Sequence, residues 1–155
     1  MPIPDFILAL RERVGTMPLW LSGAAAVVIR GDEVLLVRRA DDGQWTPVTG
    51  IIDPGEQPAA TAEREVLEEA CVVARAERLV WVSAGPVLTY DNGDVAQYLD
   101  IVFRCAWVSG EPRVGDDEST DARWWPLDAL PPMSERNRAR VDHALTDAAE
   151  AAFER

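Results

Sequence analysis

The sequence predicts an α/β sandwich in which a mixed β-sheet lies between helices. Strand-prone runs occur on both sides of a central helical segment in the 155 residues, and a further helical pattern stands at each end. The central helix is apolar on one side and acidic on the other, so one side can pack on a sheet. Because the chain is 48% hydrophobic and 27% charged, we expect one domain over residues 1–155.

The first third of the chain predicts a helix followed by a hairpin. Apolar side chains recur at helical spacing among charges over residues 3–14, so we expect a helical extension within residues 1–20. The β-prone runs 24–30 and 33–39 flank Gly31-Asp32, a pair typical of a tight turn. These runs predict the first two strands of the sheet.

Pro54-Gly55 marks a turn, and Pro58 suits the first turn of a helix that we expect to run to about Ala70. Its predicted apolar stripe consists of Ala59, Ala62, Val66 and Ala70. The remaining predicted elements are strands at 78–83, 95–108 and 122–125, a single helical turn at 127–130 and a C-terminal helix over 134–155.

Composition excludes several classes of function. The chain carries a net charge of -12 and all 15 of its basic residues are Arg, which argues against nucleic-acid binding and against a P-loop or Schiff-base lysine. His143 is the sole histidine and is expected on a helix surface, while Cys71 and Cys105 are expected as reduced thiols. No apolar run approaches the ~18 residues of a membrane span, and no basic leader begins the chain, so we expect a cytoplasmic protein.

Three glutamates define the acidic side of the central helix. Glu65, Glu68 and Glu69 stand at helical offsets of zero, three and four, which places their carboxylates on one face, with neighbours ~5–6 Å apart. Such runs usually mark a solvated face. A hard divalent cation would remove the repulsion, and Mg²⁺ commonly binds through one or two carboxylates together with substrate phosphates.

The spacing around these glutamates favours the metal-binding interpretation. Gly50 is followed after five residues by Glu56, and after seven more by Arg64-Glu65, an apolar residue, any residue and Glu68-Glu69. This pattern resembles the signature of the Nudix hydrolases, MutT-like proteins among them, and the resemblance covers roughly residues 24–130. It implies a Nudix-type α/β/α sandwich with a central mixed sheet.

The chain departs from the Nudix signature in two places. Cys71 stands where the family has a glycine just after the helix, which implies a different helix cap or backbone strain of ~1–2 kcal/mol. Upstream, where many relatives have Leu-Pro-Gly-Gly, residues 47–50 are Pro-Val-Thr-Gly, which retains Gly50. Neither change removes a carboxylate.

The resemblance implies roles for individual residues. Glu65, Glu68, Glu69 and the backbone carbonyl of Gly50 correspond to ligands of Mg²⁺ or Mn²⁺, and Glu65 or a partner such as Glu69 corresponds to the general base. Arg64 and Glu56 correspond to an ion pair that orients the loop against the helix.

Further candidates lie outside the signature. Glu118 stands where MutT-like relatives place another metal-binding carboxylate, although an ordinary acidic loop explains it equally well. Arg38 and Arg39, after a strand, are candidates for phosphate contacts, and Tyr90 for stacking on a base.

The resemblance implies cleavage of the pyrophosphate linkage in a nucleoside diphosphate joined to another group, with a nucleoside triphosphate or an ADP-ribose type of nucleotide as substrate. A non-catalytic Nudix-fold nucleotide sensor is one alternative, and an acidic interaction protein is another. The expected partner is a small nucleotide, without nucleic acid or membrane, and a homodimer stays open.

Overall fold

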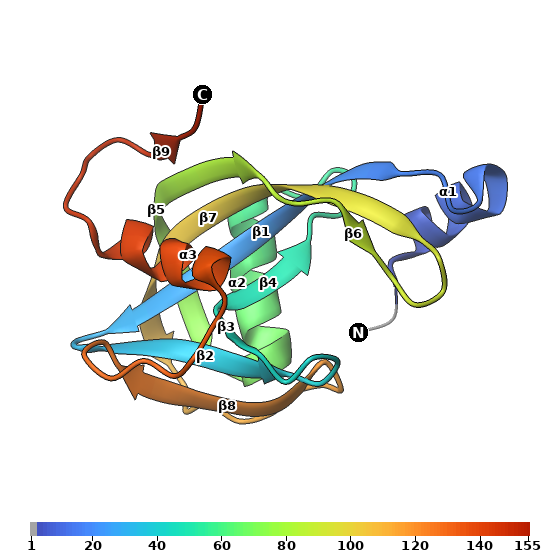
Figure 1. Ribbon diagram of the computed structural model, residues 1–155. Coiled ribbons are helices and arrows are strands. Elements are labelled where there is room, and N and C mark those ends of the chain that lie inside the picture. Colours follow the sequence, from blue (N-terminus) through green and yellow to red (C-terminus); the bar gives the residue numbers. More distant parts are fainter. Residues whose placement is uncertain (1–2) are drawn as a thin grey trace.

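The computed structural model describes residues 3–155 and confirms the predicted α/β sandwich with a mixed sheet (Figure 1). Residues 1 and 2, part of the predicted extension 1–20, lie outside the described residues. The described elements, in chain order, are α1 (Asp5–Val14), β1 (Leu19–Arg30), β2 (Glu33–Arg39), β3 (Trp45–Thr46), β4 (Val48–Ile51), α2 (Pro58–Ala70), β5 (Val73–Ala84), β6 (Leu88–Thr89), β7 (Val95–Ser109), β8 (Ser119–Pro126), α3 (Glu135–Leu145) and β9 (Ala152–Phe153).

The sheet is organised around the long strand β1. One edge of β1 pairs in parallel with β7, which in turn pairs antiparallel with β5. The other edge is shared, because residues 23–26 pair with β4 whereas residues 29–30 form the predicted hairpin with β2. Strand β2 then leaves β1 and pairs with β3 and β8. Strands β4 and β2 therefore diverge along this edge of β1. Helix α2 lies on the side where they separate.

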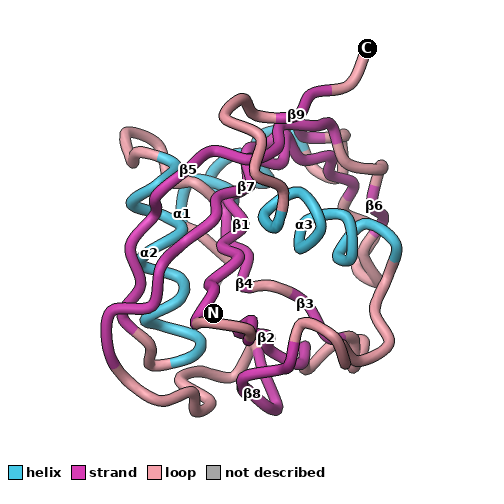
Figure 2. The backbone as a smooth tube through the Cα atoms, turned by 90° about the vertical axis from the view of Figure 1, so that its left-hand side faces the viewer, coloured by secondary structure: helices cyan, strands magenta, loops and turns pink. Residues whose placement is uncertain are grey.

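Alternate residues of β1 fill two separate cores. Ala24, Ala26 and Val28 pack with Val66 and other apolar residues of α2. The intervening Ala25 and Val27 belong to the core that contains Val141 and Ala144 of α3. Figure 2 shows the strands between α2 and α3. This alternation is what a strand buried on both faces requires.

The N-terminal helix α1 covers one end of the sheet. Ile7 is buried against Leu21 and Ala96, with Phe6 half-buried beside them. None of the described helices is long and apolar enough to cross a membrane.

The C-terminal helix is shorter than predicted. Ser134 caps α3 by accepting a hydrogen bond from the Asn137 N–H at 3.2 Å, as its residue type favours. The helix ends at Leu145, since Thr146 has extended backbone angles, and β9 then pairs with β5. The prediction of helix to residue 155 is therefore wrong beyond residue 145. The cause is tertiary, because Arg78 donates to the Thr146 carbonyl at 2.7 Å and holds the chain in the extended path.

The predicted helical turn at 127–130 is also wrong. The segment forms a hydrogen-bonded turn in which the Ala129 N–H donates to the Pro126 carbonyl at 3.0 Å. The Leu127 N–H donates instead to Asp32 at 2.8 Å, across to the β1–β2 turn. This long-range bond uses a donor that a helical turn would leave to solvent.

Helix α2 begins and ends where the sequence predicts. Pro58 lies in its first turn, and Ala62, Val66 and Ala70 of the predicted stripe are buried. Cys71 follows in the left-handed region with φ 56° and ψ 26°, and its N–H donates to the Leu67 carbonyl at 3.1 Å. The chain thus keeps the conformation that suits a glycine and bears the strain of a side chain there.

Replacing Cys71 with Gly should raise the free energy of unfolding by about 0.5–1 kcal/mol, because the relief of left-handed strain exceeds the entropy that glycine adds to the unfolded chain. Denaturant unfolding measures the change. Cys71→Ala is the control, since it removes the thiol and keeps the strain. A Gly variant no more stable than the Ala variant would contradict the prediction.

Candidate functional site

The acidic face of α2 points into the protein. Glu65 and Glu69 are only 1% and 4% exposed, whereas the Glu68 side chain is 43% exposed. Because the apolar stripe of α2 packs on the sheet, the adjoining face is turned toward β4 and toward the segment that precedes β8. Two of the three predicted metal ligands therefore lie in a confined environment, which is unusual for glutamate.

Gly50 and Glu65 are packed directly against each other. A Cβ atom at Gly50 would lie 2.1 Å from the Glu65 Cδ atom, so no other residue fits at position 50 with this carboxyl in place. One oxygen of that carboxyl, Oε2, is buried and accepts no hydrogen bond from the described residues. The backbone of β4 thus lies directly against the Glu65 carboxyl, whose buried Oε2 has lone pairs available for a metal ion.

The predicted ion pair between Arg64 and Glu56 is present and bidentate. Arg64 Nε and Nη2 donate to Glu56 Oε1 and Oε2 at 2.8 and 3.0 Å. The hydrogen bond from Arg64 lowers the pKa of Glu56 to about 2, and Glu56 in turn raises the pKa of Arg64. Arg64 Nη1 also donates to Glu65 at 2.8 Å and to Glu68 at 3.1 Å. This arginine therefore ties the loop before α2 to two of the proposed ligands.

Burial is the main cause of the raised pKa values of Glu65 and Glu69. It raises the pKa of Glu65 to about 7, against the opposing effect of Arg64. It raises the pKa of Glu69 to about 8, with Glu118 as the next contribution and Ser119 opposing. Ser119 Oγ donates to Glu69 Oε2 at 3.1 Å. Glu118 is thus close enough to both glutamates to act on their charge, as its predicted role as a ligand requires.

The segment between β7 and β8 is fastened to the end of α2. The backbone N–H groups of Arg113 and Gly115 donate to the carbonyls of Ala70 and Glu69 at 3.1 and 2.9 Å. A Cβ at Gly115 would lie 2.0 Å from the Glu68 carbonyl oxygen, so the approach depends on glycine. These bonds satisfy carbonyls that the last turn of a helix leaves open. They also fix Glu118 beside Glu69.

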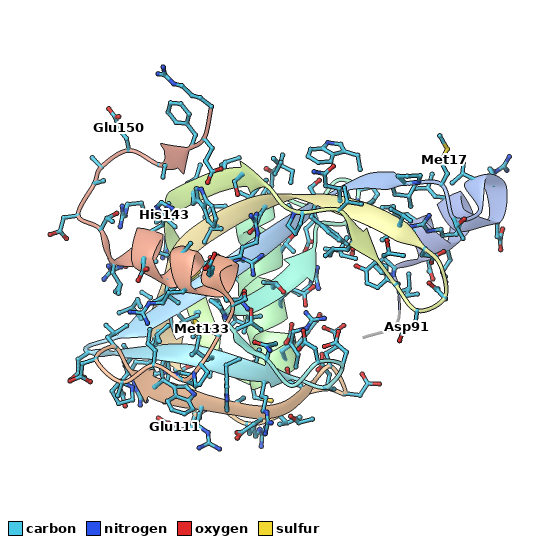
Figure 3. All side chains as sticks on the ribbon, viewed as in Figure 1. Met17, Asp91, Glu111, Met133, His143 and Glu150 are labelled. Atoms are coloured by element: carbon cyan, nitrogen blue, oxygen red, sulfur yellow. The ribbon has the colours of Figure 1, made fainter. Side chains whose placement is uncertain are left out.

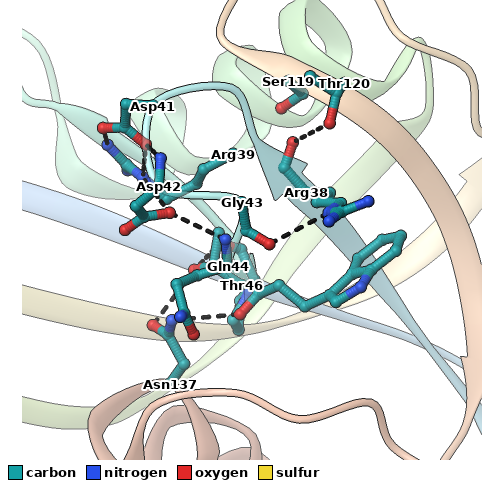
Figure 4. A network of polar contacts seen from close by, with 12 residues as sticks. Arg38, Arg39, Asp41, Asp42, Gly43, Gln44, Thr46, Ser119, Thr120 and Asn137 are labelled. Atoms are coloured by element: carbon teal, nitrogen blue, oxygen red, sulfur yellow. Dashed lines mark hydrogen bonds and ion pairs between the residues drawn. The ribbon is translucent and has the colours of Figure 1, made fainter.

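Arg38 and Arg39 diverge at the end of β2, where the pairing with β8 contains an irregularity (Figure 4). Arg38 Nε donates to the Gly43 carbonyl at 3.1 Å, and Arg39 Nε donates to Asp41 at 2.9 Å. Arg39 is also close enough to Glu69 for that carboxylate to contribute to its raised pKa, after the larger effect of Asp41. Both arginines therefore contact the loop that follows β2, and Arg39 is the one whose pKa Glu69 affects.

The aromatic candidates are mostly structural. Tyr90 is 44% exposed in the turn between β6 and β7, and its hydroxyl lies 3.3 Å from that of Tyr98. Trp45 and Trp125 pack edge to face with centroids 5.1 Å apart. His143 stacks on Trp81 at 4.7 Å on the α3 side of the sheet (Figure 3), so it is a packing residue.

A groove of about 400 Å³ adjoins the loop that carries Glu56. Phe6, Leu10 and Trp20 line one side of it, and residues 52–56 line the other. The sequence did not predict this groove, because its lining comes from α1, from the start of β1 and from the loop before α2. Ser119, Gly115 and Arg113 were missed for the same reason, since only the fold brings them to α2.

The residues fit a hard divalent cation by their chemistry. In residues 3–155 no three His, Cys, Asp or Glu side chains converge closely enough to hold a metal ion as they are placed, and Arg64 Nη1 bridges Glu65 and Glu68. The donors are nevertheless all oxygens, and the buried Glu65 Oε2 has no hydrogen-bond partner. Oxygen donors of this kind are those that Mg²⁺ and Mn²⁺ prefer.

Comparison with known proteins identifies the family, since the NUDIX domain matches residues 20–145. The chain belongs to the Nudix hydrolase family. It is 36% identical over 117 residues to the NAD-capped RNA hydrolase NudC of Pseudomonas aeruginosa, a match that covers 74% of this chain. The match covers only 39% of that relative, so this Nudix chain spans about two fifths of the length of the curated relatives it matches.

Solved Nudix structures share the fold. A MutT Nudix hydrolase from Burkholderia pseudomallei superimposes with a TM-score of 0.65 at 26% identity, over 83% of this chain and 99% of that one. An ADP-ribose pyrophosphatase from Streptococcus suis gives a TM-score of 0.65 at 22% identity, over 86% and 98% of the two chains. These likenesses confirm the predicted Nudix-type sandwich with its central mixed sheet.

The metal-free Nudix chain should lose stability as the pH rises from about 4.5 to 8. The native pKa values of Glu65 and Glu69, about 7 and about 8, lie above their ordinary value of 4.5, so unfolding releases protons within this window. We expect a loss on the order of a few kcal/mol. The lowered pKa of Glu56 changes the free energy of unfolding only below this pH window.

Denaturant unfolding in EDTA at pH 5, 6.5 and 8 measures this loss. Glu69→Gln should flatten the dependence, because the amide cannot ionise in its buried position. A free energy of unfolding that stays level or increases toward pH 8 in the unsubstituted chain would refute the assignment of raised pKa values.

Gly115→Ala should weaken Mg²⁺ or Mn²⁺ binding by about 10-fold, because the added Cβ forces the segment that carries Glu118 away from α2. Calorimetric metal titration provides the measurement. Gly31→Ala is the control, since its φ of 59° makes it a strained substitution in the β1–β2 turn with no atom within 4 Å. Equal metal affinities for the two variants would show that the docking of this segment does not position the site.

Proposed function

We propose that this chain is a metal-dependent hydrolase that cleaves the pyrophosphate linkage of a nucleoside diphosphate joined to another group, of the nucleoside triphosphate or ADP-ribose type. The observation that carries the proposal is the pair of buried carboxyl groups, Glu65 and Glu69, held on one face of α2. Burying two acids without a cation is costly, and a function in metal binding accounts for it. Residues 1–155 are proposed to form one Nudix domain.

Separate roles in metal binding and in proton transfer are proposed for the chain's residues. Glu65, Glu68, Glu69 and the Gly50 carbonyl, with Glu118 from the adjoining segment, would hold Mg²⁺ or Mn²⁺. The bound ion would neutralise phosphate oxygens and lower the pKa of the attacking water. Glu65 would accept a proton from that water, and Glu69 is the alternative.

Arg64 and Glu56 would act by position rather than by contact with the substrate. Their bidentate pair fixes the loop between β4 and α2, and with it the approach to Gly50. Arg39 is the nearer of the two candidates for a phosphate contact, because it lies close to Glu69. Arg38 and Tyr90 are the further candidates for substrate contacts; Arg38 donates to Gly43 in the turn after β2, and the Tyr90 hydroxyl lies against that of Tyr98 in β7.

The relatives support the substrate class. The name of the Pseudomonas aeruginosa relative describes hydrolysis of NAD-capped RNA, and that of the Streptococcus suis structure an ADP-ribose pyrophosphatase. Both names describe nucleoside diphosphate derivatives. The class is therefore proposed for this chain, while the individual nucleotide is left to experiment.

The alternatives make different demands on the same residues. An acidic interaction protein would keep its glutamates in water, whereas Glu65 and Glu69 are buried. A Nudix-fold sensor that binds nucleotide without turnover needs no full set of carboxylates, whereas this chain retains every carboxylate of the signature. Hydrolysis is the activity that uses all of them.

A nucleotide panel with Mg²⁺ or Mn²⁺ tests the proposal by resolving the products. We expect a nucleoside monophosphate as one product. Glu69→Gln should lower kcat/KM about 100-fold or more, because a ligand carboxylate is lost from the charge-stabilising site.

Glu63→Gln is the matched control on the same helix. The Glu63 carboxylate accepts the Ala76 N–H at 2.9 Å, away from the acidic face, and Gln preserves that acceptor. The proposal fails if no nucleotide is hydrolysed, or if the Glu69 and Glu63 variants retain the same activity. Nucleotide binding without turnover would establish the sensor instead.

A further inference from the structure

A buried ion cluster joins α3 to the sheet on the face opposite α2. Asp100 of β7 is 4% exposed, and its Oδ2 accepts hydrogen bonds from Arg140 Nε at 2.9 Å and from Arg136 Nη2 at 3.1 Å, with Arg140 Nη2 2.8 Å away in the same ion pair. Ser83 Oγ accepts from Arg136 at 2.9 Å, and Asn137 Oδ1 accepts from Arg140 at 2.7 Å. None of these residues belongs to the proposed metal site.

The cluster contains more positive than negative charge. Arg136 and Arg140 share one carboxylate, and in the described part of the chain neither forms an ion pair with another acid. Burial lowers the pKa of Arg140, Asp100 opposes that effect, and Arg136 and Arg39 add to the lowering. Arg136 also lies in the first turn of α3, where the helix dipole disfavours a cation. One further negative charge would balance this site.

Arg136 has hydrogen-bond donors that no described residue uses. Its side chain is 26% exposed, and its Nε and Nη1 donate none of the hydrogen bonds found within residues 3–155. The guanidinium lies over the Trp81 ring at 5.0 Å, which fixes its plane. A planar, oriented guanidinium with unused donors is suited to a phosphate group.

The cluster and the proposed metal site lie two strands apart and on different faces, with Asp100 bound to α3 and Gly50 packed against Glu65 of α2. Asp100 is opposite Gly23 of β1, and the neighbouring Ala24 is opposite Gly50 of β4. With strands ~4.8 Å apart, the rows that carry Asp100 and Gly50 are about 10 Å apart. A Cβ on Gly23 would lie 3.5 Å from the Gly50 carbonyl oxygen and 3.7 Å from the Tyr98 ring, so a glycine at position 23 leaves the Gly50 carbonyl uncovered from this side.

We infer that Arg136, held by Asp100 and Trp81 with Arg140 beside it, is an anion subsite that binds a phosphate group of the substrate outside the scissile linkage. Because Asp100 and Gly50 stand two strands apart, a phosphate at Arg136 would be a different group from the two phosphates joined by the scissile linkage at Gly50. The substrate class is a nucleotide that carries a further phosphate, for example on a ribose hydroxyl. This inference rests on the proposed function for its biological context only.

Binding without turnover tests the subsite. AMP, adenosine 2′,5′-bisphosphate and adenosine 3′,5′-bisphosphate are titrated by calorimetry in EDTA, so no hydrolysis is needed and failure of the proposed catalysis would leave this result intact. We expect at least one bisphosphate to bind about tenfold or more tightly than AMP. Arg136→Gln should reduce that preference to less than about twofold, because the charged donors are lost.

Arg138→Gln is the matched control. Arg138 lies on the same helix but is 53% exposed, and its side chain pairs with Asp142 at 3.2 Å, away from the cluster. This variant should keep the full preference for the bisphosphate. If Arg136→Gln does not fold, Arg136→Lys keeps the charge and loses the planar donors, and should reduce the preference at least threefold.

Two results would overturn the subsite. One is an unsubstituted protein that binds neither bisphosphate more tightly than AMP, including one that binds none of the three. The other is a folded Arg136 variant that retains the preference, which would leave the cluster as an anchor for α3 alone.

Discussion

The burial of two carboxyl groups on one helix is the constraint on which the rest of this structure depends. Glu65 and Glu69 lie one turn apart, and burial raises their pKa values from 4.5 to about 7 and about 8. Arg64 and Ser119 limit that cost by donating hydrogen bonds, and Gly50 leaves room for a carboxyl, whereas Glu118 adds to the cost. A bound cation would reduce the cost of burial further, since it favours the charged form of both groups.

The fold supplies this environment through the split in its sheet. Because β1 pairs with β4 at one level and with β2 at another, two layers diverge and α2 lies where they separate. The segment between β7 and β8 then closes the end of α2 with backbone hydrogen bonds. Strain at Cys71 is tolerated at this closure, because the buried apolar stripe and these bonds together fix the path of the chain.

The sequence predicted those parts of the site that are encoded by local spacing. Helical periodicity and Pro58 predicted α2, and the Nudix signature predicted the contact between Arg64 and Glu56. The sequence could not show that Ser119 and Gly115 contact α2, because nothing in a linear pattern links residues about 50 positions apart. The overlong C-terminal helix has the same origin, since periodicity carries no information about the hydrogen bonds from β5 that hold residue 146 in an extended path.

The distribution of charge gives the arginines a purpose beyond stability. A protein with a net charge of -12 repels anionic nucleotides at long range, so the attraction that holds a substrate must come from short distances. Arg39, whose pKa Glu69 affects, and Arg136, paired with Asp100, are the groups proposed to supply it. If both contact the substrate, they would select a ligand by the spacing of its negative charges. Such selection requires guanidinium groups held in fixed ion pairs, because a mobile cation attracts anions without measuring the distance between them.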